Sequence, residues 1–165
     1  MTVKLKINGV KITDKGFKRI TKELKELKNT RTLVGLPGDL GNHGDENISI
    51  AEIGAQNEFG HSNVPSRPWM RQTADRARTK RKFTSLMKSQ YSKMLTGMTT
   101  PRRINRFLGE WYISELKQTI KNGNFVPNSE FTTLNKGSTT PLIDTGLMRN
   151  SITSRIEYKG SRARR

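Results

Sequence analysis

The sequence predicts an α+β fold, in which a small, mainly antiparallel sheet carries several helices on one face and the longest helices are central. Segments 3–12 and 151–158 alternate apolar and polar residues, as strands with one buried face do. Between them, segment 101–122 carries an unbroken apolar stripe at helical spacing: Ile104, Leu108, Tyr112, Leu116 and Ile120. Two strand-forming ends around long helices are typical of an α+β fold.

The N-terminal part predicts a hairpin, a helix and a strand. Val3, Leu5 and Ile7 alternate with lysines, and Asn8-Gly9 is a dipeptide favoured in two-residue hairpin turns. Thr13 or Asp14 can cap a helix that extends to about Lys28. Its apolar face consists of Phe17, Ile20, Leu24 and Leu27. A short strand over 31–36 follows.

A glycine-rich polar loop spans 37–47, and its Asp39, Asn42 and Asp45 invite comparison with a calcium loop. That comparison fails, because such a loop counted from Asp39 requires a glutamate at its twelfth position, where Ile50 stands. We therefore expect a surface loop and no metal site.

Segment 48–71 predicts a helix, an abrupt stop and a second helix joined by a rigid elbow. Gly60 suits a left-handed C-cap, and Pro65 and Pro68 keep the residues before them extended. The elbow would present Arg67 and Trp69 from a fixed backbone, and this is a suitable place for contact with a partner. The alternative for Trp69 is a core anchor beneath a loop, because large aromatic residues are usually buried.

A long helix is expected from about Trp69 to Leu95, with a basic run over 76–82 that is too charged to be buried. The helix would extend beyond the core there or pack along a partner. Thr100 and Pro101 start the next helix, and Gly123 ends it.

The C-terminal part is rich in turns. A short helix is possible around 130–136, and Asp144 or Thr145 can cap a single turn through Leu147 and Met148. Asp144, Thr145 and Gly146 are expected to fix this turn rather than to touch a partner. One domain over 1–158 and a basic, disordered tail over 159–165 complete the prediction.

The composition restricts the function. The net charge of +17 attracts nucleic acid, acidic protein surfaces or anionic membranes. With no cysteine, the chain has neither disulfides nor thiolate metal sites. It has no apolar run of about 18 residues and no apolar core of a signal peptide, so we expect no membrane span and synthesis in the cytoplasm.

We expect no enzyme, no cofactor and no small-molecule substrate. A Glu58–His61 pair could act as a general base, but an exposed loop histidine is the more common situation. Ser151 lacks a glycine-flanked nucleophile elbow, and no phosphate-binding P-loop motif occurs.

Nucleic-acid binding is the alternative function. The basic residues expected to form the patch are Arg76, Arg78, Lys80, Arg81, Lys82, Arg102, Arg103 and Arg106. Such residues could contact the phosphate backbone, with an affinity that falls steeply with salt. The aromatic residues do not alternate with these charges, so no base-stacking surface is expected and binding would lack sequence specificity.

Three ordered pieces resemble one family. Val34-Gly35 ends a strand, NEFG (57–60) leads into VPSRPWMR (64–71), and PLIDTGLMRNSI spans 141–152. This set resembles the tail-completion, or neck and virion-morphogenesis, proteins of long-tailed bacteriophages. Members typically show an EFG turn, a P-x-RP-[FW] elbow and a PL-[IV]-DTG-x-[LM]-RNSI segment. The resemblance covers residues 33–156, with the long middle helices matched by position alone.

The resemblance implies a structural virion protein at the head–tail junction, in a ring that is usually sixfold, between the connector and a tail-terminator or tail-tube protein. The elbow would supply one subunit contact and the sheet edge or the long helices the other. Aromatic and arginine residues are the usual interface anchors, so the expected contact residues are Glu58, Phe59, Arg67, Trp69 and Arg71. The basic run lies outside the family pattern. We expect it to face acidic proteins, with contact to packaged DNA as the alternative.

Overall fold

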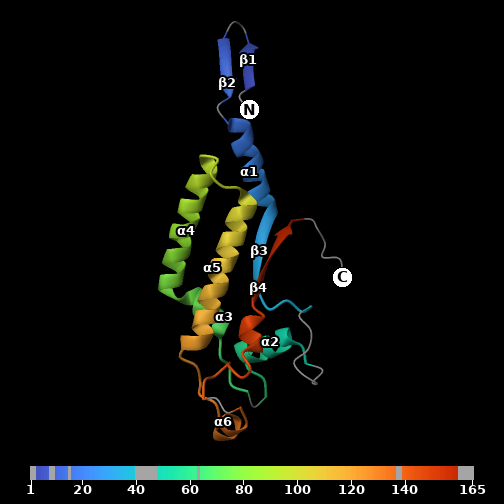
Figure 1. Ribbon diagram of the computed structural model, residues 1–165, viewed down its shortest axis with the longest axis vertical. Helices are drawn as coiled ribbons and strands as arrows, with labels where there is room; N and C mark the ends of the chain where they lie inside the picture. Colours follow the sequence, from blue (N-terminus) through green and yellow to red (C-terminus); the bar gives the residue numbers. More distant parts are fainter. Residues whose placement is uncertain are drawn as a thin grey trace.

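The computed structural model describes residues 3–7, 10–14, 16–39, 48–62, 64–136 and 139–159 (Figure 1). The predicted α+β class is confirmed: the described helices are combined with small antiparallel sheets. Most of the glycine-rich loop and, apart from Lys159, the expected tail lie outside the described residues.

The strands form two separate antiparallel pairs. β1 (Val3–Ile7) pairs with β2 (Val10–Asp14), with Ile7 opposite Val10, as the predicted hairpin requires. β3 (Thr30–Gly35) pairs with β4 (Thr153–Tyr158), so strands from the two halves of the chain meet. The β3–β4 pair lies against the long helix over Pro101–Asn122. The β1–β2 hairpin lies beyond the N-terminal end of the helix over Phe17–Asn29 (Figure 1).

α1 (Phe17–Asn29) begins later than predicted. The capping role given to Thr13 or Asp14 is wrong, because β2 continues through Asp14 and Gly16, at a φ of 117°, turns the chain into the helix. Only glycine adopts this φ at little cost.

Arg19 links α1 to the C-terminal end of the helix over Ala77–Leu95. Its guanidinium donates to the carbonyl oxygens of Met94 at 2.9 Å and Leu95 at 2.8 Å, and it pairs with Glu23 at 2.7 Å. Carbonyl groups at a helix C-terminus lack intrahelical partners and carry partial negative charge. The arginine therefore both caps that helix and links it to α1.

Replacing Arg19 with alanine should lower the free energy of unfolding by about 1–2 kcal/mol, because two carbonyl groups lose a charged donor. Chemical denaturation measures this. The matched control is Lys18→Ala, which removes one exposed positive charge from the same helix and should change stability by less than about 0.5 kcal/mol. Equal losses in the two variants would contradict the capping role.

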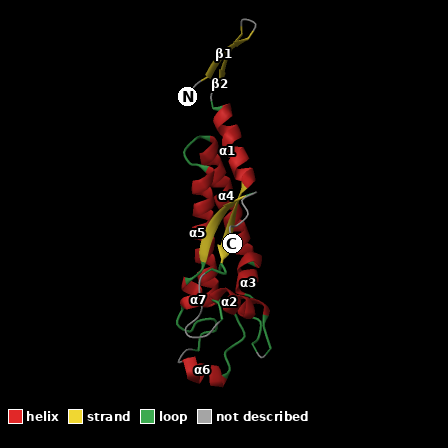
Figure 2. Ribbon diagram, turned by 90° about the vertical axis from the view of Figure 1, so that its right-hand side faces the viewer, coloured by secondary structure: helices red, strands yellow, loops and turns green. Residues whose placement is uncertain are grey.

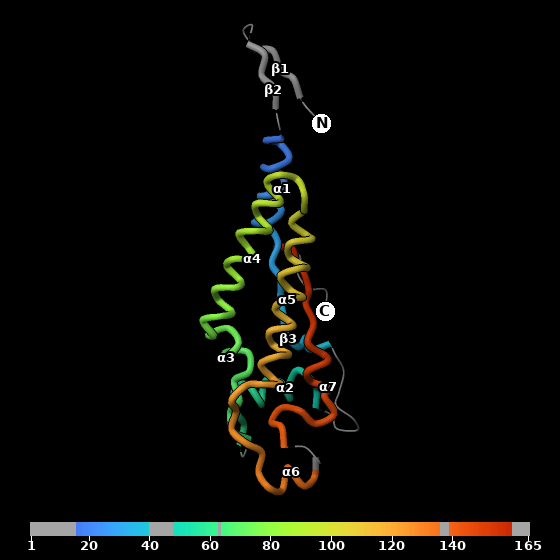
Figure 3. Tube along the Cα trace, turned by 60° about the vertical axis from the view of Figure 1, so that its left-hand side comes forward, coloured from blue at the N-terminus to red at the C-terminus, as the bar shows by residue number. Residues whose placement is uncertain are grey.

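The predicted helix over 69–95 is divided in two, so that prediction is wrong. α3 (Trp69–Asp75) ends at Arg76, whose ψ of 119° is extended, and α4 (Ala77–Leu95) starts directly after it. Both pieces pack against α5 (Pro101–Asn122), the helix predicted from the apolar stripe (Figure 3). The bend lets each piece follow the surface of α5: Thr73 donates to Thr119, and Thr79 donates to Glu115.

α5 has the predicted bounds and cap. The Thr100 hydroxyl accepts from the Arg103 N–H, Pro101 occupies the first turn, and Gly123 follows the last residue. Gly109 lies where α5 crosses the sheet, and a Cβ there would approach the Ser154 Cβ to 2.9 Å. The absent side chain thus lets helix and sheet pack closely.

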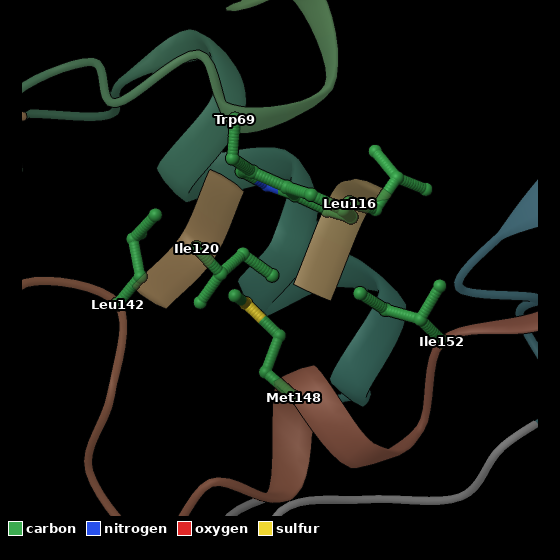
Figure 4. Close-up of a cluster of buried hydrophobic side chains, with 6 residues drawn as sticks. All are labelled: Trp69, Leu116, Ile120, Leu142, Met148 and Ile152. Carbon is green, nitrogen blue, oxygen red and sulfur yellow. The ribbon is translucent and has the colours of Figure 1, made fainter. Parts of the chain in front are cut away.

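Two apolar clusters lie along α5. One consists of Trp69, Leu116, Ile120, Leu142, Met148 and Ile152, which come from α3, α5 and segment 141–152 (Figure 4). The other consists of Met94, Ile104 and Leu108, between α4 and α5. The larger cluster draws the C-terminal segment 141–152 onto α5 and α3.

The remaining helices gather at the end of the molecule that holds α3 (Figure 2). They are α2 (Ile50–Phe59), α6 (Glu130–Lys136) and α7 (Leu147–Asn150). The turn before α7 has Gly146 at a φ of 78°, and the Thr145 hydroxyl accepts from the Leu147 N–H at 3.3 Å. Asp144 is exposed. None of the described helices has the length and apolarity needed to cross a membrane.

Candidate interaction surface

Glu58 is buried within its own chain, with 6% of its surface exposed. Its carboxylate accepts from the backbone N–H groups of Met70 at 2.8 Å and Arg71 at 3.0 Å. These groups lie at the start of α3, where helix N–H groups lack partners and the dipole favours negative charge. Glu58 therefore joins α2 to α3, and its assignment as a partner contact is wrong.

Trp69 and Arg67 do not project from the elbow, so this prediction is also wrong. Trp69 is 1% exposed, and its indole N–H donates to the Gly54 carbonyl oxygen at 3.3 Å. Arg67 is 7% exposed, and its guanidinium donates to the carbonyl oxygens of Val126 at 2.8 Å and Pro127 at 3.1 Å. Burial lowers the pKa of the Arg67 guanidinium below its ordinary value. The core-anchor alternative for Trp69 is the one the structure shows.

The elbow itself is closed by its own hydrogen bonds. The Arg67 N–H donates to the Asn57 carbonyl oxygen at 2.6 Å, and the Ser66 hydroxyl donates to the Glu58 carbonyl oxygen at 2.9 Å. Gly60 has a φ of 80°, which favours glycine as expected, but its ψ of 156° lies outside the left-handed helical region of the predicted cap. Pro65 is exposed, and Pro68 immediately precedes α3. The elbow is thus a rigid part of the fold.

Phe59 and Arg71 remain exposed, and Phe59 is 70% exposed. They belong to an open groove of about 680 Å³ between α2, α3 and the end of β3. The groove is lined by Val34, Gly35, Leu36, Ala51, Gly54, Ala55, Glu58, Phe59, Trp69, Met70, Arg71, Ala74 and Tyr112. We call it the lower groove. Its lining is mostly apolar, and small alanine side chains leave room for a partner.

A second groove, of about 620 Å³, lies between α4, α5 and β3, and we call it the upper groove. Phe83, Met87 and Tyr91 of α4 and the segment 30–34 of β3 are among its lining residues. Val34 and Tyr112 line both grooves, so the two are adjacent along β3. Burial, with the negative charges of Asp75 and Glu58, raises the pKa of the Tyr112 phenol.

Residues 30–34 form one edge of the sheet. β3 pairs with β4 along its other edge, and no further strand pairs with it within the described ranges. An unpaired edge offers backbone N–H and C=O groups to another chain. The apolar surface and the free strand edge together form the candidate interaction surface. The upper groove lies where the sheet edge or the long helices were expected to supply a contact, but the sequence did not identify its residues, because its walls come from segments distant in the chain and each segment alone shows only ordinary core spacing.

The expected basic patch divides into two groups. Arg76, Arg78, Lys80, Arg81 and Lys82 lie around the start of α4, and Arg102, Arg103 and Arg106 lie at the start of α5. Because α4 and α5 run antiparallel, these groups lie at opposite ends of the helix pair (Figure 3). The run is not wholly exposed, because Thr79 is buried against α5. A single patch of these residues is therefore wrong.

His61 is exposed, and its ring lies 3.3 Å from the Ser62 hydroxyl. Of the loop once compared with a calcium site, only Pro37, Gly38 and Asp39 are described. Arg155 donates to Asp39 at 2.8 Å and, mainly through this hydrogen bond, lowers the pKa of that carboxyl. Among the described residues, no three His, Asp or Glu side chains lie close enough to hold a metal ion.

A scan of the chain against models of protein families, a search of curated proteins and a search of solved structures each found no match.

Proposed function

We propose that this chain is a structural subunit of the bacteriophage head–tail junction, a tail-completion or neck protein that assembles with copies of itself into a ring. The observation that carries the proposal is the pair of adjacent apolar grooves along the unpaired edge of β3. Large open apolar surfaces on a folded chain mark sites where another macromolecule binds.

The motifs that resemble the phage family support the proposal by their position. Val34-Gly35, Glu58-Phe59 and the Trp69–Arg71 stretch all line the lower groove. The last of the three pieces, over 141–152, supplies Leu142, Met148 and Ile152 to the cluster around Trp69. Three segments, around residues 34, 58 and 70, thus line one surface, and segment 141–152 packs against Trp69 in the core next to it.

A neighbouring subunit has two kinds of contact available in these grooves. The unpaired backbone of β3 can take an added strand, whose main-chain hydrogen bonds supply affinity. Apolar and aromatic side chains such as Phe59, Phe83 and Tyr91 can form the desolvated centre of the interface. A ring also requires a second, different patch on each copy. The chain exposes Phe17 and Leu24 on α1 and Phe131 and Leu134 on α6, which are the apolar candidates for it.

The test is the oligomeric state of the full chain, measured by native mass spectrometry and electron microscopy. Ala55 lies exposed in the lower groove, and Ala77 is exposed on α4 outside both grooves. We expect the wild-type chain and Ala77→Glu to form rings. Ala55→Glu places a charge where an apolar partner would pack, and we expect its association to weaken at least about tenfold with unchanged thermal stability.

Two results would contradict the proposal. One is a wild-type chain that stays monomeric up to high concentration, alone and with the neighbouring tail protein. The other is equal behaviour of the Ala55→Glu and Ala77→Glu variants, which would remove the groove from the interface. The location in the virion is tested separately by mass spectrometry of purified phage particles. We expect to detect this polypeptide in them, and its absence would contradict the proposed location.

A further inference from the structure

The outward face of α4 carries cations and hydroxyl groups in one row. Arg78, Arg81, Ser85, Lys88 and Ser92 follow one another at spacings of three and four residues, and all five are exposed. Residues at these spacings share one face of a helix. We call this row the outer stripe. The buried Thr79 and Met94 lie on the opposite side of α4, which packs on α5.

The surroundings of the outer stripe are also basic and polar. Lys80, Lys82, Thr84 and Ser89 flank it and are exposed, and α4 contains no acidic residue. Among the ion pairs of the described residues, only Lys80–Asp75, at 3.1 Å, involves α4. A shallow depression of about 490 Å³ follows this side of the helix and is lined by Lys80, Arg81, Thr84, Ser85 and Lys88. The cations of the stripe therefore face solvent with their charge uncompensated by a local carboxylate.

The side chains in the stripe distinguish between two kinds of acidic partner. A protein interface has a desolvated centre of aromatic or other apolar side chains, and the stripe contains none. The nearby Phe83 instead stacks on Trp111, with ring centroids 5.9 Å apart. Phosphate oxygens of nucleic acids, by contrast, are bound by Lys, Arg, Ser and Thr side chains without an apolar centre.

We propose that the outer stripe binds the phosphate backbone of double-stranded nucleic acid without reading base sequence. Arg78 and Lys88 are ten residues apart, which is about 15 Å along a helix. Duplex DNA carries one charge per roughly 1.7 Å of its axis, so several phosphates fall within this length. The sequence alone favours acidic proteins as the partners of these basic residues. The stripe instead favours phosphates, because it lacks the apolar anchors of a protein interface.

This inference goes beyond the proposed ring and does not depend on it. Phe83, Met87 and Tyr91 line the upper groove, and the outer stripe lies on the other side of α4. A neighbour bound in the grooves would leave the stripe accessible. The basic group at the start of α5 is not part of the stripe, since it lies at the other end of the helix pair.

The test uses the full chain and a labelled 30-base-pair duplex in fluorescence-anisotropy titrations at several salt concentrations. The stripe variant is R78Q/R81Q/K88Q. The control is K18Q/K22Q/K25Q, which removes three exposed charges from α1 and gives the same net charge. We expect the stripe variant to make the slope of log K against log salt less negative by about 2.7, because each lost phosphate contact contributes about 0.9. The control should keep the wild-type slope and affinity.

Poly-L-glutamate at matched charge concentration is the competitor that represents an acidic protein surface. We expect it to displace the duplex far less effectively than unlabelled DNA. Equal loss of affinity in the two variants, or equal displacement by poly-L-glutamate, would overturn the inference. Native mass spectrometry of the same samples separates the two proposals: a wild-type chain that forms rings but does not bind DNA contradicts only this inference.

Discussion

Replacing Trp69 with alanine should lower the free energy of unfolding by about 3–5 kcal/mol. The indole is 1% exposed and packs among Leu116, Ile120 and Met148 (Figure 4), so its removal leaves a cavity that the surrounding helices cannot fill. The Gly54 carbonyl oxygen also loses its donor. The free energy of unfolding of a native domain is about 5–15 kcal/mol, so the variant should be only marginally folded.

Chemical denaturation followed by circular dichroism measures this loss. The matched control is Trp111→Ala, the only other tryptophan, which is partly exposed and stacks on Phe83 at the surface of α5. We expect it to cost about 1–2 kcal/mol. If the two tryptophan variants lose equal stability, Trp69 is not the centre of the core.

Replacing Glu58 with alanine should cost about 2–4 kcal/mol, because two N–H groups at the start of α3 lose a charged acceptor in a buried site. Glu58→Gln keeps the shape and one acceptor oxygen, and it should lose about half as much. Glu52→Ala removes an exposed carboxylate from the first turn of the same helix and serves as the control. Its cost should stay below about 1 kcal/mol, which is the contribution expected of an exposed carboxylate at a helix N-terminus.

The Glu58 variants also separate a structural role from a partner contact. A structural role predicts that stability falls in the isolated chain, before any assembly is measured. A variant that keeps its thermal unfolding temperature but fails to form rings would return Glu58 to the interface and contradict the geometry described above.

Several elements could be predicted from the sequence because their signals are local. α5 has its apolar stripe, its Thr100 cap and its closing Gly123 within one continuous segment, and its observed bounds are the predicted ones. The signals for the β1–β2 hairpin and for the short α6 are equally local. The division between α3 and α4 has no local signal, because Arg76 is not a helix-breaking residue. It accompanies contacts with a distant segment: on the two sides of the bend, Thr73 and Thr79 donate to Thr119 and Glu115 of α5.

The candidate site was less predictable, because one residue type serves both cores and interfaces. A tryptophan and an arginine beside prolines fit a partner contact, and they fit a core anchor equally well. Burial decided between these roles, and burial depends on the distant segments 123–129 and 141–152, which cover Arg67 and Trp69. Only Phe59 and Arg71 of the expected contact residues stay on the surface.

The sequence by itself determined the α+β class, the principal helix and the excess of positive charge, because alternation, apolar spacing, caps and ionisable groups are properties of consecutive residues. Only the tertiary structure decided which side chains are free to bind. It buried three of the five expected contact residues, divided the basic residues between opposite ends of two antiparallel helices, and formed grooves along an unpaired strand. A surface is made of residues that meet in space, and their meeting depends on how the whole chain packs.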